Sequence, residues 1–112
     1  MLEIQAQIHS TIRADNDNPF LQGPYRPIQT EYTASPPDLV VHGEIPRDLH
    51  GIYIRNSHNQ VHEPLGRYPP FDGDGMLHAM HFADGHAQYR NRFIRTTGFL
   101  AEQAAGRSLW PG

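Results

Sequence analysis

The sequence predicts an all-β fold with short elements, on three observations. Gly and Pro each number 10 among 112 residues, and this frequency predicts many turns. Asp84-Gly85 separates two strand-like runs, and Asp-Gly in that position favours a hairpin because Gly accepts the positive φ of a type I′ turn. Three or four strands can be recognised in all, with no helix long enough to cover them.

Residues 1–38 are expected to form an extended, partly disordered N-terminal arm. Residues 1–14 show only a weak helical pattern, so we interpret them as a frayed or accessory segment. Residues 15–19 predict a turn, because Asx side chains bond nearby backbone and a proline follows them. Four prolines exclude a regular helix between residues 20 and 37: Pro24, Pro27, Pro36 and Pro37.

Residues 39–112 are expected to form an incomplete β-structure. Residues 39–41 and 51–56 are rich in β-formers and predict two strands, and residues 57–70 predict a polar loop. The hairpin follows, with a first strand over residues 76–82 whose two faces are both largely apolar. Such a strand is expected to be buried on both sides.

The second hairpin strand, over residues 88–95, is far more polar and is expected nearer an edge. Phe99 to Ala105 predict a short C-terminal helix, with Thr97 as its N-cap and Gly106 as its C-cap. A strand that is apolar on both faces needs a neighbour on each side, which this chain does not supply. The pattern therefore indicates part of a larger β-structure, or self-association through unpaired strand edges.

Composition argues against several classes of function. The net charge is −3, so no basic surface for nucleic acid is indicated. The absence of cysteine excludes disulfides, thiolate metal sites and cysteine nucleophiles. The N-terminus lacks the apolar run of a signal peptide and no stretch approaches 18 apolar residues, so a cytoplasmic protein without a transmembrane segment is expected.

Two patterns could be metal sites, and spacing argues against both. Asp72-Gly73-Asp74-Gly75 resembles the start of a calcium loop, but position 12 of such a loop is Ala83 where a bidentate Glu is needed. The aspartates are therefore expected to accept backbone N–H groups.

The pairs His58/His62 and His78/His81 are not preorganised: the first lies in the predicted loop, and the second points to opposite faces of a strand. We interpret His78 as a hydrogen-bonded core histidine. A His-rich metal binder using the first pair stays a weaker alternative. The serines Ser10, Ser35, Ser57 and Ser108 lack the sequence context of a nucleophile.

Three ordered blocks resemble the N-terminal region of the carotenoid cleavage oxygenase family. They are Gly51-Ile-Tyr-Ile-Arg-Asn56, Phe71-Asp-Gly-Asp-Gly-Met-Leu-His78-Ala, and Tyr89-Arg-Asn-Arg-Phe-Ile-Arg95-Thr. Asn18-Pro-Phe-Leu-Gln-Gly-Pro-Tyr25-Arg-Pro also fits the extended arm of that family. The likeness covers residues 18–110, which is about the first quarter of a full member. Residues 55–60 depart from the Arg-Asn-Gly-Pro-Asn-Pro of much of the family, which suggests a bacterial subgroup.

The resemblance implies a partial seven-bladed β-propeller from a non-haem Fe(II) dioxygenase. Such enzymes hold iron with four His, oriented by Glu, and cleave a C=C bond of carotenoids, apocarotenoids or stilbenes with O₂. None of these histidines of the chain matches a ligand motif of the family: His42, His50, His58, His62, His78, His81 and His86. We therefore assign no catalytic, cofactor-binding or metal residue.

This chain alone is accordingly expected to bind no cofactor and to be inactive. The alternatives are a non-catalytic β-rich interaction module or a truncated gene product.

Overall fold

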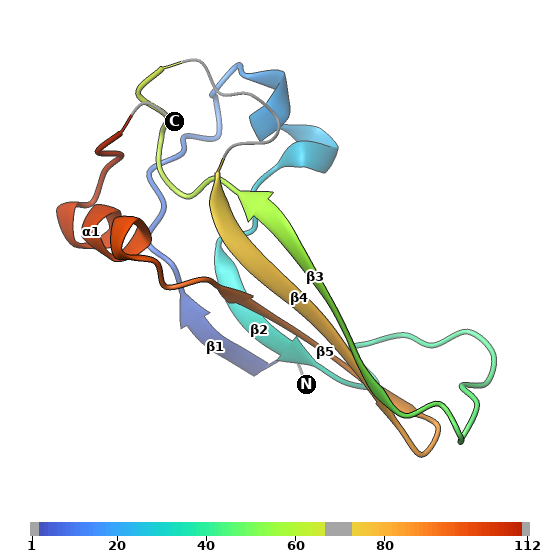
Figure 1. Cartoon of the computed structure of the whole chain (residues 1–112). Coiled ribbons are helices and arrows are strands. Elements are labelled where there is room, and N and C mark those ends of the chain that lie inside the picture. The colour runs from blue at the N-terminus through green and yellow to red at the C-terminus, as the bar shows by residue number, and fades with distance from the viewer. Residues whose placement is uncertain (1–2, 67–72, 111–112) are drawn as a thin grey trace.

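One antiparallel sheet forms the body of the protein. The computed structural model describes residues 3–66 and 73–110. Within them the strand order is β1-β2-β5-β4-β3, and a short helix lies beyond one end of the sheet (Figure 1). The strands are β1 Glu3–Gln7, β2 Thr30–Ala34, β3 Gly51–Asn59, β4 Asp74–Ala83 and β5 His86–Phe93; the helix is α1 Thr97–Ala105, and two 3₁₀ turns span Pro19–Leu21 and Gly23–Tyr25. The predicted all-β class with a short C-terminal helix is confirmed.

The hairpin of β4 and β5 has the turn that the sequence predicts. Ala83 pairs with His86, and the two residues between them have φ angles of 51° at Asp84 and 78° at Gly85. Two positive φ angles in succession are the signature of a type I′ turn. A Cβ at Gly85 would also lie 3.4 Å from the carbonyl oxygen of Ile45, so both conformation and space favour glycine here.

Strand β5 lies inside the sheet, so its predicted place near an edge is wrong. It pairs with β4 along its whole length and with β2 on the other side. The β2–β5 register includes only two residue pairs, and side chains of β5 complete the junction. Asn91 Oδ1 accepts the Tyr32 N–H at 2.8 Å, and Arg92 donates to the Tyr32 carbonyl at 3.1 Å. The polar residues of β5 thus bond to a neighbouring strand.

Several other sequence predictions need correction. Part of residues 1–14 forms β1, which pairs with β2 through an irregularity between Ile4 and Ala6. Residues 39–41 form no strand, because their β-formers have no partner strand to pair with. The predicted loop at 57–70 begins too early, since β3 pairs with β4 as far as Asn59.

The prediction that β4 is buried on both faces holds only in part. Met76 is fully buried, but Leu77 on the opposite face is 39% exposed. One face of β4 therefore lacks a covering layer in the part of the chain that the structure describes. Strands β1 and β2 both lie within residues 1–38, and the proposed boundary at residue 38 stays a prediction.

Helix α1 begins two residues earlier than predicted, and its N-cap lies one residue earlier. The hydroxyl of Thr96, and not of Thr97, accepts the Phe99 N–H at 3.0 Å and caps the helix. The C-cap is Gly106 as predicted, in the left-handed conformation with φ of 70°. Among the described residues, no helix has the length and apolar character needed to cross a bilayer.

The hydrophobic core lies where one end of the sheet meets α1 and the segment after β1. It consists of Ile8, Val61, Met76, Phe93 and Phe99, with Ile28 packed against them. The rings of Phe93 and Phe99 stack at 5.2 Å between centroids. The core therefore joins residues that are far apart in the sequence, whereas the hairpin end of the sheet extends away from it (Figure 1).

A buried ion pair connects β2 to the end of β5. Glu31 is 2% exposed and its carboxylate accepts the Phe93 N–H at 2.7 Å and the guanidinium of Arg95 at 2.7 Å. Burial by itself would raise the pKa of Glu31, but these hydrogen bonds and the positive charges of Arg95 and Arg92 outweigh it, so the pKa is lowered. Arg95 also lies over the Phe99 ring, at 5.6 Å from its centroid.

We predict that Glu31→Ala lowers the free energy of unfolding by about 3 kcal/mol, because it leaves the Phe93 N–H and Arg95 without their acceptor. Urea unfolding at pH 7 measures this loss. Glu31→Gln keeps one acceptor oxygen and should lose less. Because the folded pKa lies below the reference of 4.5, the contribution is present above that pH and lost as pH falls through the folded pKa. A loss that does not shrink in acid would contradict the role of the carboxylate.

Candidate functional site

The aspartate motif before β4 has a structural role. Asp74 opens β4, and its Oδ2 accepts the Val61 N–H at 3.2 Å, as predicted for these carboxylates. Burial raises the pKa of Asp74, and the nearby Glu102 raises it further, against the lowering effect of the bond from Val61. Asp72 lies outside the described residues. The motif thus fixes the start of a strand to the preceding chain segment.

The two histidine pairs are not brought together. His58 is exposed on β3, whereas His62 is buried and its ring nitrogens bond to Thr11 and Gln103. His78 and His81 project from opposite faces of β4. The described residues contain no group of three or more His, Cys, Asp or Glu side chains that could hold a metal ion. These described residues therefore offer no ligand set for iron.

His78 is hydrogen-bonded, as predicted, at the centre of a polar chain across three strands. Hydrogen bonds join Ser57 Oγ to His78 Nε2 at 2.7 Å and His78 Nδ1 to the Tyr89 hydroxyl at 2.6 Å. Burial lowers the pKa of His78, and the charge of Arg55 lowers it further. The structure therefore favours a neutral imidazole at neutral pH.

The hydrogen-bonded series Ser57–His78–Tyr89 resembles a catalytic serine–histidine pair, with a phenol in place of the usual carboxylate. Burial, with the neighbouring Tyr32, raises the pKa of Tyr89 to about 12, so the hydroxyl stays neutral. A neutral phenol cannot stabilise an imidazolium as a carboxylate does. The arrangement fixes the three strands, and it lacks the carboxylate that orients and stabilises the histidine in a catalytic triad. The sequence alone did not indicate that Ser57 and Tyr89 bond to His78. These contacts depend on the alignment of neighbouring strands, in which Arg55 lies opposite His78.

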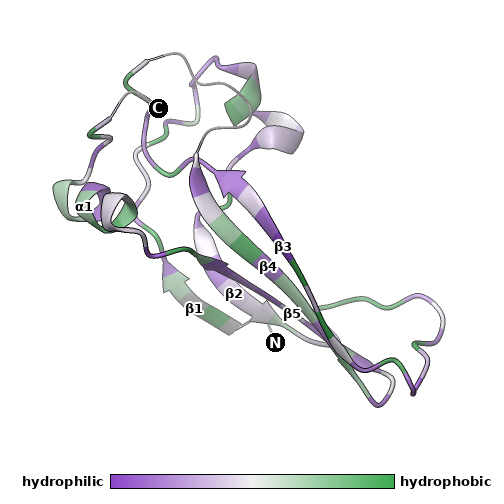
Figure 2. Ribbon diagram, in the orientation of Figure 1, coloured by the Kyte–Doolittle hydropathy of each residue, from purple (hydrophilic) through white to green (hydrophobic). Residues whose placement is uncertain are grey.

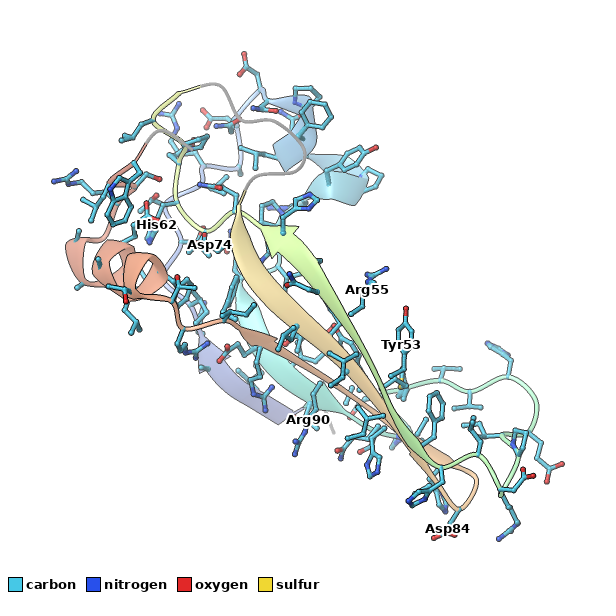
Figure 3. The ribbon with its side chains drawn as sticks, in the orientation of Figure 1. Tyr53, Arg55, His62, Asp74, Asp84 and Arg90 are labelled. Carbon is cyan, nitrogen blue, oxygen red and sulfur yellow. The ribbon has the colours of Figure 1, made fainter. Side chains whose placement is uncertain are left out.

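A shallow cavity of about 390 Å³ lies over His78 and Tyr89, on one face of the sheet. Its lining is Tyr53, Arg55, His78, Ala79, Met80 and Tyr89. Figure 3 shows Tyr53 and Arg55 on one side of the sheet and Arg90 on the other. The cavity is bounded by the outer strand β3 and is open beyond it.

Among the described residues, no strand pairs with the outer side of β3, and this edge strand carries apolar side chains on both faces. Ile52, Tyr53 and Ile54 are 61%, 64% and 58% exposed. Figure 2 shows this apolar stretch in β3, between the hydrophilic arrowhead and the hairpin end. An edge strand exposing both its backbone and large apolar side chains is typical of a surface that pairs with further structure.

Known proteins share both the sequence and the sheet. The family described as retinal pigment epithelial membrane protein matches residues 25–112. A carotenoid cleavage oxygenase of Mycobacterium tuberculosis is 44% identical over 90 residues, covering 79% of this chain and 18% of the relative. An isoeugenol monooxygenase of Pseudomonas nitroreducens is 38% identical over 98 residues, covering 88% and 20%.

Solved structures of the same group have this fold. The lignostilbene dioxygenase of Pseudomonas brassicacearum matches with a TM-score of 0.74 and 34% identity, covering 83% of this chain and 19% of that one. A Synechocystis apocarotenoid oxygenase variant matches with a TM-score of 0.59 and 36% identity, covering 71% and 17%.

These matches define the class as a β-sheet portion of an oxygenase-type fold. The chain belongs to the retinal pigment epithelial membrane protein family, which confirms the resemblance seen in its sequence. It spans about a fifth of the length of the relatives it matches, slightly less than the quarter that the sequence suggested.

We predict that Arg55→Gln raises the pKa of His78 but leaves it below its ordinary value, because the change removes a positive charge and leaves the imidazole buried. A ¹³C-detected NMR titration measures the value. Arg90→Gln is the matched control, since that side chain lies on the opposite face of the sheet. An equal shift in both variants would show that Arg55 acts only through net charge.

We predict that Asp74→Asn keeps or raises stability at pH 7, by up to about 1 kcal/mol, because the amide oxygen can still accept the Val61 N–H without a buried charge. The raised folded pKa of Asp74 means that its favourable contribution exists below the unfolded value and is lost as pH rises. The gain should therefore shrink toward pH 4 in thermal unfolding. Asp74→Ala, which removes the acceptor, should instead destabilise; equal effects of the two variants would contradict this account.

Proposed function

We propose that this chain forms the N-terminal portion of a dioxygenase that cleaves a C=C bond of an apolar polyene or stilbene with O₂. The observation that carries the proposal is the match of residues 25–112 to one family, together with relatives whose names are carotenoid cleavage oxygenase and lignostilbene dioxygenase. The complete fold in this proposal is a seven-bladed β-propeller with Fe(II) at its centre, to which this chain contributes one sheet.

The open side of the sheet supports this proposal. The exposed apolar residues of β3 and the cavity beside them form a surface suited to further strands. The described residues offer no iron ligand set, so the metal would be held by the remaining polypeptide. On this proposal the role of the chain is to complete the scaffold, and alone it is inactive. The cytoplasmic location expected from the sequence also stays a prediction.

A second candidate is a non-catalytic β-rich module that associates with another chain or with itself. The same edge favours it, because unpaired N–H and C=O groups beside exposed Ile52 and Ile54 can pair with any suitable strand. The first candidate pairs with the rest of a dioxygenase and should then show enzymatic activity. The second pairs with another chain or with itself and should show none.

We predict that the purified chain retains no stoichiometric iron and cleaves no apocarotenal or stilbene. Co-expression with the Pseudomonas brassicacearum lignostilbene dioxygenase lacking the segment that this chain matches should give a complex that retains iron and cleaves stilbene substrate. The physical reason is that β3 gains the neighbour its apolar faces require. Metal analysis and product chromatography measure the result.

Ile54→Arg should reduce complex formation, because it places a charge on the edge strand. Val40→Arg is the matched control, since Val40 is 70% exposed and lies outside every described strand. Turnover by the chain alone would contradict the proposed scaffold role. Oligomers of the chain alone that Ile54→Arg disrupts, without any complementation, would favour the second candidate.

A further inference from the structure

The segment that follows β3, residues 60–63, is held from three directions. The Val61 carbonyl accepts the Thr11 N–H at 3.2 Å, and Thr11 Oγ1 accepts the Glu63 N–H at 2.9 Å. The Val61 N–H donates to Asp74 at the start of β4. The third contact of this segment is with α1, and His62 makes it. Figure 3 places His62 between α1 and the segment near Asp74.

His62 is buried, with 2% of its surface exposed, and both ring nitrogens have partners. The side-chain amide nitrogen of Gln103 lies 3.0 Å from the His9 carbonyl oxygen and 2.9 Å from His62 Nε2. An amide nitrogen only donates, and the carbonyl oxygen can only accept, so this orientation of Gln103 is fixed by His9. The Nε2 atom must therefore be an acceptor without a proton.

The other ring nitrogen is then the donor. His62 Nδ1 lies 3.3 Å from Thr11 Oγ1, so the hydroxyl oxygen accepts the Nδ1–H. The hydrogen bonds thus select one neutral tautomer of His62. In that tautomer the ring joins the segment after β1 to α1.

A second proton on His62 would break this arrangement. An Nε2–H would face the N–H groups of Gln103, which have no lone pair to offer. Rotation of the amide would present its oxygen to His62, but that oxygen would then face the His9 carbonyl oxygen. Either outcome removes a contact that holds α1 to the N-terminal segment.

Charged groups around His62 come from each packed element. On α1, the charge of Glu102 acts on His62, and the His9 ring on the segment after β1 lies 5.9 Å from the His62 ring between centroids. On β4, Asp74 lies beyond Val61, and Glu63 is directed to Arg13 and Asn16. Burial lowers the pKa of His62 and His9 adds to this effect, while Glu102 opposes it.

We propose that His62 is a pH-sensitive clasp. In its neutral form it fastens helix α1 and residues 9–11 to the segment 60–63, and protonation in mild acid releases them while β3, β4 and β5 stay paired. The inference stands apart from the proposed function, because it rests only on contacts within the chain. Since the folded pKa is below the unfolded value of 6.5, the clasp contributes fully above about pH 6.5 and weakens as pH falls below it.

Two NMR measurements test the clasp. Long-range ¹H–¹⁵N spectra at pH 7.5 should show Nδ1 protonated and Nε2 bare in His62; the opposite tautomer overturns the proposal. Hydrogen exchange, corrected for intrinsic rates, should show protection of the Thr11 and Gly106 amides falling by up to about tenfold per pH unit from about pH 6.5 down to the folded pKa of His62, and levelling off below it. Protection of the β4–β5 amides should fall less steeply, and an equal fall everywhere would indicate global unfolding and contradict local release.

Variants at both partners make the test specific. His62→Gln offers an acceptor to Gln103 but does not titrate in this range, so protection of Thr11 and Gly106 should become insensitive to pH. His86→Gln, at an exposed histidine of β5, should behave as wild type. Gln103→Glu presents a carboxylate to Nε2 and should raise the pKa of His62 toward or beyond its unfolded value, which weakens or reverses the pH dependence. An unchanged fall in protection in either His62→Gln or Gln103→Glu overturns the proposal.

Discussion

The sheet depends on the hydrogen bonds and the ion pair made by the buried carboxylate of Glu31. Glu31 lies on β2 in the N-terminal third of the chain, and its partners, the Phe93 N–H and Arg95, lie more than 60 residues later. Arg95 in turn covers Phe99 of α1. One carboxylate therefore connects β2, the end of β5 and the helix. A buried charge is stable only when it is paired and fully bonded, so this contact also fixes the register of the strands it joins.

The polar character of β5 follows from the same constraint. Ladder pairs between β2 and β5 are few, and Asn91 and Arg92 bond the backbone of β2 instead. Side-chain bonds of this kind are specific for one alignment of the strands, whereas apolar contacts tolerate several. Strand β5, at the centre of the sheet, is thus polar where its side chains bond to β2. It becomes apolar at Phe93, where the core begins.

The sequence predicted the features set by local chemistry and failed on those set by distant partners. The Asp84-Gly85 turn and the Gly106 cap follow from the conformational freedom of single residues, and both are confirmed. The place of β5 depends on Glu31 and Asn91, which no local pattern reveals. The structural role of Asp74 was predictable from its type, but its acceptance of the Val61 N–H was not. The tautomer of His62 required three segments to be in place.

The distribution of burial is consistent with the proposal that this chain is one portion of a larger fold. The core gathers at the α1 end of the sheet, and the apolar residues of β3 stay exposed at the other side. At the α1 end the sheet is covered by packed side chains. Along β3 the apolar side chains are exposed, which favours pairing with a further strand. The polar series of Ser57, His78 and Tyr89 joins β3, β4 and β5 and so fixes these strands. On the proposed function, the residues that stabilise this sheet and those that perform the reaction would therefore occupy separate parts of the sequence.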